Sequence, residues 1–135
     1  MDGLGACLIQ DSKPVAYASA ALTETQKCYA QIEKETLAVV FATEKFHHYV
    51  YNKDIKIHTD HKPLESIFKK PLSKCPPRIA RMMLSLQKYR LNVQWKPGKE
   101  MYIADALSRI YIEKECENLN SKEYNIEVYY TSTIS

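Results

Sequence analysis

The 135-residue sequence has no long apolar run and no leader-like start. Nothing in it approaches the stretch of about 20 apolar residues that crosses a bilayer. The first residues, Met1-Asp2-Gly3-Leu4-Gly5, place no basic region before an apolar one, as a secretory signal would. These absences predict an intracellular protein with no membrane partner.

Cysteine is sparse and widely spaced. The four cysteines are Cys7, Cys28, Cys75 and Cys116, and no two of them form a CxxC pair. Zinc ribbons and dithiol redox motifs need such pairs, so the sequence offers neither. With 45% hydrophobic and 26% charged residues, the chain has the composition of one ordinary globular domain.

Acidic residues are absent from one long segment of the chain. Residues 69–99 contain nine Lys and Arg residues and no Asp or Glu, whereas the net charge of the whole chain is only +3. Such a segment could follow a polyanion such as nucleic acid. Equally, it could be the solvated face of a helix that happens to be basic.

Turn residues and helix-forming residues organise the first part of the chain. Residues 6–10 and 15–19 flank a turn-forming sequence and predict a β-hairpin. Thr23 and Gln26 have the spacing of a capping box. From about Ala30 to Tyr49 the chain is rich in Ala, Leu, Glu and Lys and has no Gly or Pro, which predicts one long helix, packed on more than one side.

Periodicity continues in the second part and then fades. Residues 55–59 and 91–95 alternate apolar and polar side chains and predict two strands. Between them, apolar residues fall at helical spacing and predict a second helix: Ile79, Met82, Met83 and Leu86. Residues 104–110 predict a short helix, after which the chain is polar and aperiodic. We therefore predict a domain over residues 1–110 and a polar linker or tail over residues 111–135, leading to a following domain.

Three acids have unusual settings. Glu35 shares a helix face with Val39 and Phe46, so it should face the core or a cleft. Asp60 ends a predicted strand, and Asp105 lies among small and apolar residues. Carboxylates held together away from bulk water repel one another, and a divalent cation relieves that repulsion. Spacing alone leaves open whether these acids converge or are exposed separately.

Five short motifs occur in order along residues 1 to about 109. They are Gly3-Leu4-Gly5-Ala6, Tyr29-Ala30-Gln31-Ile32-Glu33-Lys34-Glu35, Thr59-Asp60-His61-Lys62-Pro63-Leu64, Lys96-Pro97-Gly98-Lys99 and Ala104-Asp105-Ala106-Leu107-Ser108-Arg109. Each motif alone is a weak signal, but the ordered set resembles the RNase H-like domain of gypsy-type LTR retrotransposon polyproteins. The resemblance implies an α/β (α+β) fold with a mixed five-stranded sheet flanked by helices.

The resemblance also implies a chemistry. It maps the family's metal-binding carboxylates to Glu35, Asp60 and Asp105, which would hold two Mg²⁺ ions, with Mn²⁺ able to substitute. In the family, these ions activate a water molecule and stabilise the leaving oxygen when the RNA strand of an RNA/DNA hybrid is cut. The polymerase and integrase domains of the parent polyprotein would be its partners. The resemblance implies a location in the cytoplasm or in a virus-like particle.

Positive side chains would hold the hybrid by its phosphates. The predicted set is Lys69, Lys70, Lys74, Arg78, Arg81, Lys96 and Lys99, with His61 as a further substrate contact. For His61, stabilisation of the turn is an equal alternative. Trp95 could face the hybrid, but a core position at the end of a strand is favoured.

The sequence departs from the family pattern at its start. In the family, a central strand ending in Asp-Ala-Ser precedes the glycine that matches Gly3, and its aspartate is the first metal ligand. This chain starts after that strand, and Asp2 adjoins the glycine without taking the ligand's place. We therefore expect impaired cleavage and a sheet that lacks its central strand.

Two hypotheses of other classes stay open. One is a non-catalytic or domesticated remnant that binds nucleic acid or a protein partner without cleaving. The other is a structural tether between polymerase and integrase, which convergence of the three acids would argue against.

Overall fold

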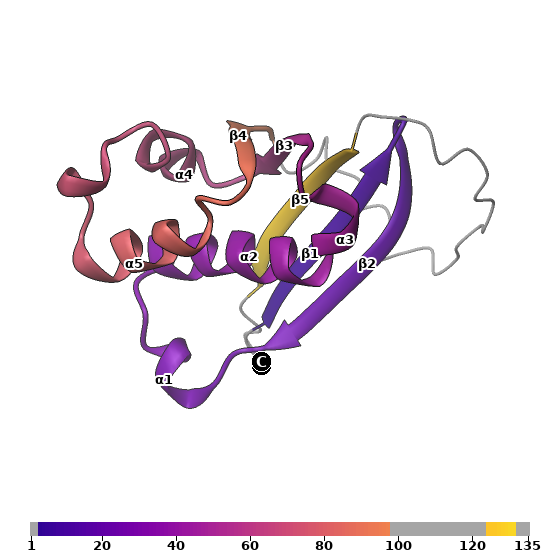
Figure 1. Cartoon of the computed structure of the whole chain (residues 1–135). Coiled ribbons are helices and arrows are strands. Elements are labelled where there is room, and N and C mark those ends of the chain that lie inside the picture. Colours follow the sequence, from indigo (N-terminus) through magenta and orange to yellow (C-terminus); the bar gives the residue numbers. More distant parts are fainter. Residues whose placement is uncertain (1–2, 98–123, 132–135) are drawn as a thin grey trace.

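The computed structural model describes residues 3–97 and 124–131 of the chain. Its strands are β1 (Gly3–Gln10), β2 (Lys13–Ala21), β3 (Asp54–Thr59), β4 (Arg90–Trp95) and β5 (Tyr124–Thr131). Its helices are α1 (Glu24–Lys27), α2 (Gln31–Lys45), α3 (His47–Val50), α4 (Lys62–Ile67), the 3-10 helix η1 (Leu72–Lys74) and α5 (Pro77–Ser85). Figure 1 shows α2 running across the sheet; α3, α4 and α5 contact it, whereas α1 lies apart from it.

The described strands form one five-stranded sheet in the order β2-β1-β5-β3-β4. β1 pairs antiparallel with β2 and with β5, whereas β3 pairs parallel with β4 and with β5. β5, drawn in yellow in Figure 1, therefore joins the antiparallel half of the sheet to the parallel half. The mixed five-stranded sheet with helices expected from the sequence is confirmed.

The last strand corrects the prediction of a polar tail. The sequence pattern predicts a linker over residues 111–135, but Tyr124–Thr131 form the central strand of the sheet. Tyr124, Ile126 and Val128 alternate along this strand and are at most 8% exposed. The central place that was expected to be empty is thus filled by β5. Residues 98–123, including the short helix predicted at 104–110, lie outside the described residues.

The hairpin of β1 and β2 turns where the sequence predicts. Asp11 and Ser12 connect the two strands with φ angles of 52° and 67°, and Gln10 pairs with Lys13 across the turn. Two successive left-handed residues match the right-handed twist of the strands that they join. Six consecutive residues of β1 are buried, whereas β2 forms an edge of the sheet with no buried residue.

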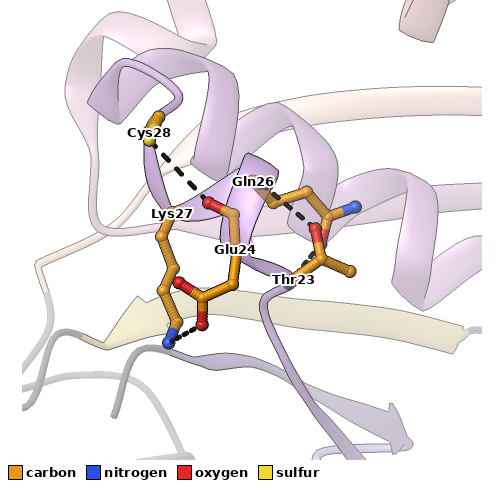
Figure 2. Close-up of polar contacts among 5 residues, drawn as sticks. All are labelled: Thr23, Glu24, Gln26, Lys27 and Cys28. Atoms are coloured by element: carbon orange, nitrogen blue, oxygen red, sulfur yellow. Dashed lines mark hydrogen bonds and ion pairs between the residues drawn. The ribbon is translucent and has the colours of Figure 1, made fainter.

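The capping box predicted at Thr23 is present and begins a short helix. Figure 2 shows the reciprocal pair: the backbone N–H of Gln26 donates to Oγ1 of Thr23 at 3.1 Å, and the N–H of Thr23 donates to Oε1 of Gln26 at 3.0 Å. Lys27 forms an ion pair with Glu24 at 3.2 Å within the same turn. The box therefore begins α1 alone, and α2 begins separately at Gln31.

The long helix predicted from Ala30 to Tyr49 is divided in two. Phe46, with φ −104° and ψ 23°, separates α2 from α3. Its side chain is only 5% exposed, so the break keeps an apolar ring in the core. The fully buried residues Ala38, Val39 and Ala42 lie on α2, which packs against β1 and β5 and also against α4 and α5. Packing on more than one side is as the sequence predicts.

Two helices follow β3. α4 begins at Lys62 with Pro63 in its first turn, where the missing N–H of proline costs no intrahelical bond. The sequence analysis did not predict this helix. The second predicted helix is present as α5, which buries Ile79 and Met83. No helix in the described ranges is long and apolar enough to cross a membrane.

Candidate active site

Glu35 lies in the first half of α2 and is only 2% exposed, as its helical spacing predicts. Its Oε2 accepts a hydrogen bond from Nε2 of Gln31, one helical turn earlier, at 3.0 Å. Its Oε1 is buried and has no hydrogen-bond partner among the described residues. Gln31 is not among the predicted site residues, although its position four residues before Glu35 is a usable signal. Burying a carboxylate oxygen without a hydrogen-bond donor costs free energy. Oε1 of Glu35 can therefore still accept a hydrogen bond or bind a cation.

Asp60 follows directly after β3 and is exposed to solvent. Its negative charge reaches Glu35. Burial first, and the charge of Asp60 second, raise the pKa of Glu35 from 4.5 to about 7, and the hydrogen bond from Gln31 only partly offsets this. The structure therefore brings the start of α2 and the end of β3 together, with two mutually repelling carboxylates between them.

The pair has the chemistry of a divalent-cation site. Carboxylate oxygens are the ligands that Mg²⁺ takes in proteins, and a cation would relieve the repulsion that raises the pKa of Glu35. Asp105, the third predicted ligand, lies outside the described residues. Within residues 3–97 and 124–131, no group of three His, Cys, Asp or Glu side chains is placed to hold a metal ion. Glu35 and Asp60 could supply two carboxylates to such a site.

The raised pKa of Glu35 predicts that Glu35→Gln stabilises the fold at high pH. Between pH 4.5 and about 7 the folded chain keeps the proton that the unfolded chain has lost, so stability falls as pH rises through this window. Glutamine carries no charge and escapes this loss. In metal-free buffer we expect Glu35→Gln to gain roughly 1 to 3 kcal/mol relative to the wild type on going from pH 4 to pH 8, measured by urea unfolding.

Glu33 provides the matched control on the same helix. Its Oε1 accepts the N–H of Ala30 at 2.9 Å and pairs with Arg78 at 3.0 Å. Glu33→Gln removes a favourable charge, so it should not stabilise the fold at pH 8. A pH-independent difference between Glu35→Gln and the wild type would show that Glu35 is ionised normally and would contradict its burial beside Asp60.

Further polar and aromatic groups surround Asp60. The backbone N–H of His61 donates to Oγ1 of Thr59 at 3.1 Å. Burial lowers the pKa of His61, and the charge of Asp60 opposes this. Trp95 pairs with Thr59 across β3 and β4 and is 40% exposed, with Nζ of Lys62 5.1 Å from its ring centre. The prediction that Trp95 lies in the core is therefore wrong, because this end of the strand is open to solvent.

The predicted phosphate contacts are spread over several elements. Lys69 and Lys70 follow α4, Lys74 ends η1, Arg78 and Arg81 lie on α5, and Lys96 follows β4. All are exposed except Lys96, which is half-buried and donates its backbone N–H to the carbonyl oxygen of Thr59 at 2.9 Å. Lys96 therefore lies at the Asp60 end of the sheet. Lys99 is outside the described residues.

Arg78 differs from the other predicted contacts because it is already engaged. Its Nη1 donates to Oε1 of Glu33 at 3.0 Å, and its guanidinium lies 4.2 Å from the ring centre of Tyr29. Both partners belong to the segment that begins α2, so Arg78 ties α5 to the helix that carries Glu35. This role could not be predicted from the sequence, because only the fold brings residues 29–33 to α5.

Comparison with known proteins identifies the family of the chain. The family model "RNase H-like domain found in reverse transcriptase" matches residues 1–89. The Drosophila melanogaster retrovirus-related Pol polyprotein from transposon 297 is 39% identical over 113 residues, 82% of this chain. The one from transposon gypsy is 36% identical over 120 residues, 88% of this chain. The Schizosaccharomyces pombe transposon Tf2-3 polyprotein is 35% identical over 115 residues, 84% of this chain. The alignments span only 9% to 11% of these relatives' length.

Proposed function

Because the chain belongs to the family of RNase H-like domains found in reverse transcriptases, we propose that it hydrolyses the RNA strand of RNA/DNA hybrids by two-metal catalysis. It would act as one domain of a retrotransposon Pol polyprotein, beside polymerase and integrase domains. The observation that carries the proposal is the coupling of Glu35 and Asp60 at one end of the sheet.

The residues of the chain have defined tasks in this proposal. Glu35 and Asp60 hold the cations, and Asp105 is proposed as a third ligand. Bound Mg²⁺, or Mn²⁺ in its place, supplies an activated water and stabilises the leaving oxygen of the RNA strand. Gln31 fixes the carboxylate of Glu35 through the 3.0 Å hydrogen bond to Oε2, which leaves Oε1 available as a ligand. No side chain needs to act as a nucleophile.

We further propose that this chain alone cleaves weakly. The resemblance implies a central strand that ends in a metal-binding aspartate, and here the central strand is β5. Val128 of β5 pairs with Thr59, the residue before Asp60, and the next residue of β5 is Tyr129. The one acid of β5, Glu127, lies one position earlier than Val128 and is buried. The sequence of β5 therefore has no acid at the two positions that follow the Val128 and Thr59 pair, where the family pattern has a carboxylate.

A second candidate function is binding without cleavage. It is favoured by the exposed lysines between α4 and α5, which need no metal site to hold a polyanion. The two candidates share the basic surface and differ in chemistry. Cleavage assays separate them, and binding assays test the surface that both require.

Hybrid binding is proposed to use the exposed lysines between α4 and α5. Nucleic-acid affinity that depends on neutralised phosphates falls with salt at a log–log slope of roughly −0.9 per phosphate. We expect the triple variant Lys69→Ala, Lys70→Ala, Lys74→Ala to flatten the slope by about 2 to 3, measured by fluorescence anisotropy with a labelled hybrid.

Lys53→Ala is a suitable control for the charge change. Lys53 is exposed in the turn before β3, and its Nζ lies 5.6 Å from the ring centre of Tyr124. It is at the opposite end of β3 from Asp60 and should leave the slope unchanged. Equal slopes for the triple variant and the wild type would mean that the basic segment is only a solvated face.

A further inference from the structure

A cavity of about 510 Å³ lies between α4, η1, α5 and the start of β4. Its apolar lining consists of Phe68, Leu72, Met83, Leu86, Tyr89 and Leu91. Lys70 and Gln87 complete the lining, and both are exposed. None of its lining residues belongs to the Glu35 and Asp60 pair, and only Lys70 among them is also proposed to hold the hybrid. Its volume is in the range of ligand pockets.

The walls of the cavity select for an apolar group. Met83, Leu86 and Tyr89 are at most 9% exposed and form its inner wall. The hydroxyl of Tyr89 is occupied by Nδ1 of His47 at 2.6 Å and the carbonyl oxygen of Thr43 at 3.4 Å. The inner wall therefore presents carbon and sulfur, and a methionine adapts to varied apolar shapes.

The surroundings of the cavity are positively charged. Lys69, Lys70 and Lys74 are exposed on the side of α4 and η1, and Lys88 is exposed on the side of Tyr89, with its Nζ 5.6 Å from that ring. Residues 69–99 contain no acid, whereas the charge of Glu44 reaches Tyr89 and helps to raise its pKa. A partner with negative charges flanking an apolar group would match both the wall and the rim.

We propose that this cavity binds an acidic protein segment, which inserts one large apolar side chain and places carboxylates against the flanking lysines. Nucleic acid fits less well, because phosphates gain nothing from an apolar wall. Bases need an exposed aromatic face on which to stack. The lining has two aromatic residues: Tyr89 is only 7% exposed, and Phe68 is half-buried and packs against the core. A buried apolar anchor with a charged rim is a common arrangement at protein interfaces.

The test is selection of a random 12-residue peptide library on the full 135-residue chain, followed by anisotropy measurements with the selected peptides. We expect the selected peptides to carry Leu, Phe or Met flanked by Asp or Glu. Leu72→Arg should weaken their binding at least tenfold, although it adds positive charge, and Lys70→Glu should do the same by charge reversal. Leu84→Arg is the matched control. Leu84 is 58% exposed on α5 and does not line the cavity, so this variant should bind the selected peptides as the wild type does.

Several outcomes would overturn the proposal. Selected peptides without acids or without an apolar residue would do so, as would equal binding to Leu72→Arg and the wild type when thermal melting shows that both are folded. Binding of a 12-nucleotide single-stranded DNA that falls tenfold in Leu72→Arg would assign the cavity to nucleic acid instead. Asp60→Asn should leave peptide binding unchanged, so failure of the cleavage proposal and failure of this one are distinguishable.

Discussion

Asp60→Asn is expected to lower Mg²⁺-dependent cleavage of an RNA/DNA hybrid roughly a hundredfold or more. Because the chain alone is proposed to cleave weakly, the assay should use the chain extended upstream by a family-type strand ending in Asp-Ala-Ser. That strand would take the central place between β1 and β3 that β5 fills here. The amide of asparagine keeps the size of Asp60 and removes the charge that couples to Glu35. The variant would remove one of the two negative charges that hold a cation between these side chains.

Two controls separate chemistry from folding. Asp54→Asn changes an acid at the other end of the same strand, where Asp54 forms an ion pair with Arg90 at 2.7 Å, and should leave cleavage within about twofold. Asparagine in place of the upstream aspartate should preserve thermal melting and abolish cleavage. If the unextended chain cleaves efficiently and Asp60→Asn abolishes this, the weak activity proposed for the chain alone is wrong.

Removing β5 is expected to abolish cooperative folding. A chain that ends at residue 123 loses the strand that pairs with both β1 and β3, and the two halves of the sheet then have no shared ladder. It also loses Ile126 and Val128, both fully buried. A single Ile126→Ala change should cost about 2 to 5 kcal/mol, out of a total near 5 to 15 kcal/mol, measured by denaturant unfolding.

Asn125→Ala is the control on the same strand. Asn125 is half-buried and its side chain alternates with that of Ile126, so its loss should cost less than about 1 kcal/mol. A truncated chain that melts cooperatively at the temperature of the intact chain would mean that β5 is not part of the sheet in solution. That result would also restore the predicted tail over residues 111–135.

Much of the sheet could be predicted because its strands carry local patterns. Residues 55–59 and 91–95 alternate strictly, and both became strands within one residue of the predicted ends. β5 has the same signal in Tyr124, Ile126 and Val128, but the polar residues between them suggested an exposed tail. Burial of Glu127 inside a sheet is a tertiary effect, which alternation does not reveal.

Some features of the helices could also be predicted from the sequence, whereas others could not. The capping box at Thr23 follows from residue types, whereas the break at Phe46 depends on the ring packing into the core. For the candidate site, the burial of Glu35 followed from its helical stripe. Its closeness to Asp60 could not be predicted in this way, because a separation of 25 residues in the sequence does not determine a distance in space. Only the resemblance implied that these two acids meet.

The central claim, that Glu35 and Asp60 form a divalent-cation site, is tested most directly by Mn²⁺ titration of the ¹⁵N-labelled chain. Bound Mn²⁺ broadens the amide signals of nearby residues whether or not the chain cleaves. We predict broadening centred on Glu35 and on residues 59–61, competed by Mg²⁺, lost in Asp60→Asn and retained in Asp54→Asn. Broadening centred elsewhere, or unchanged in Asp60→Asn, would contradict the claim.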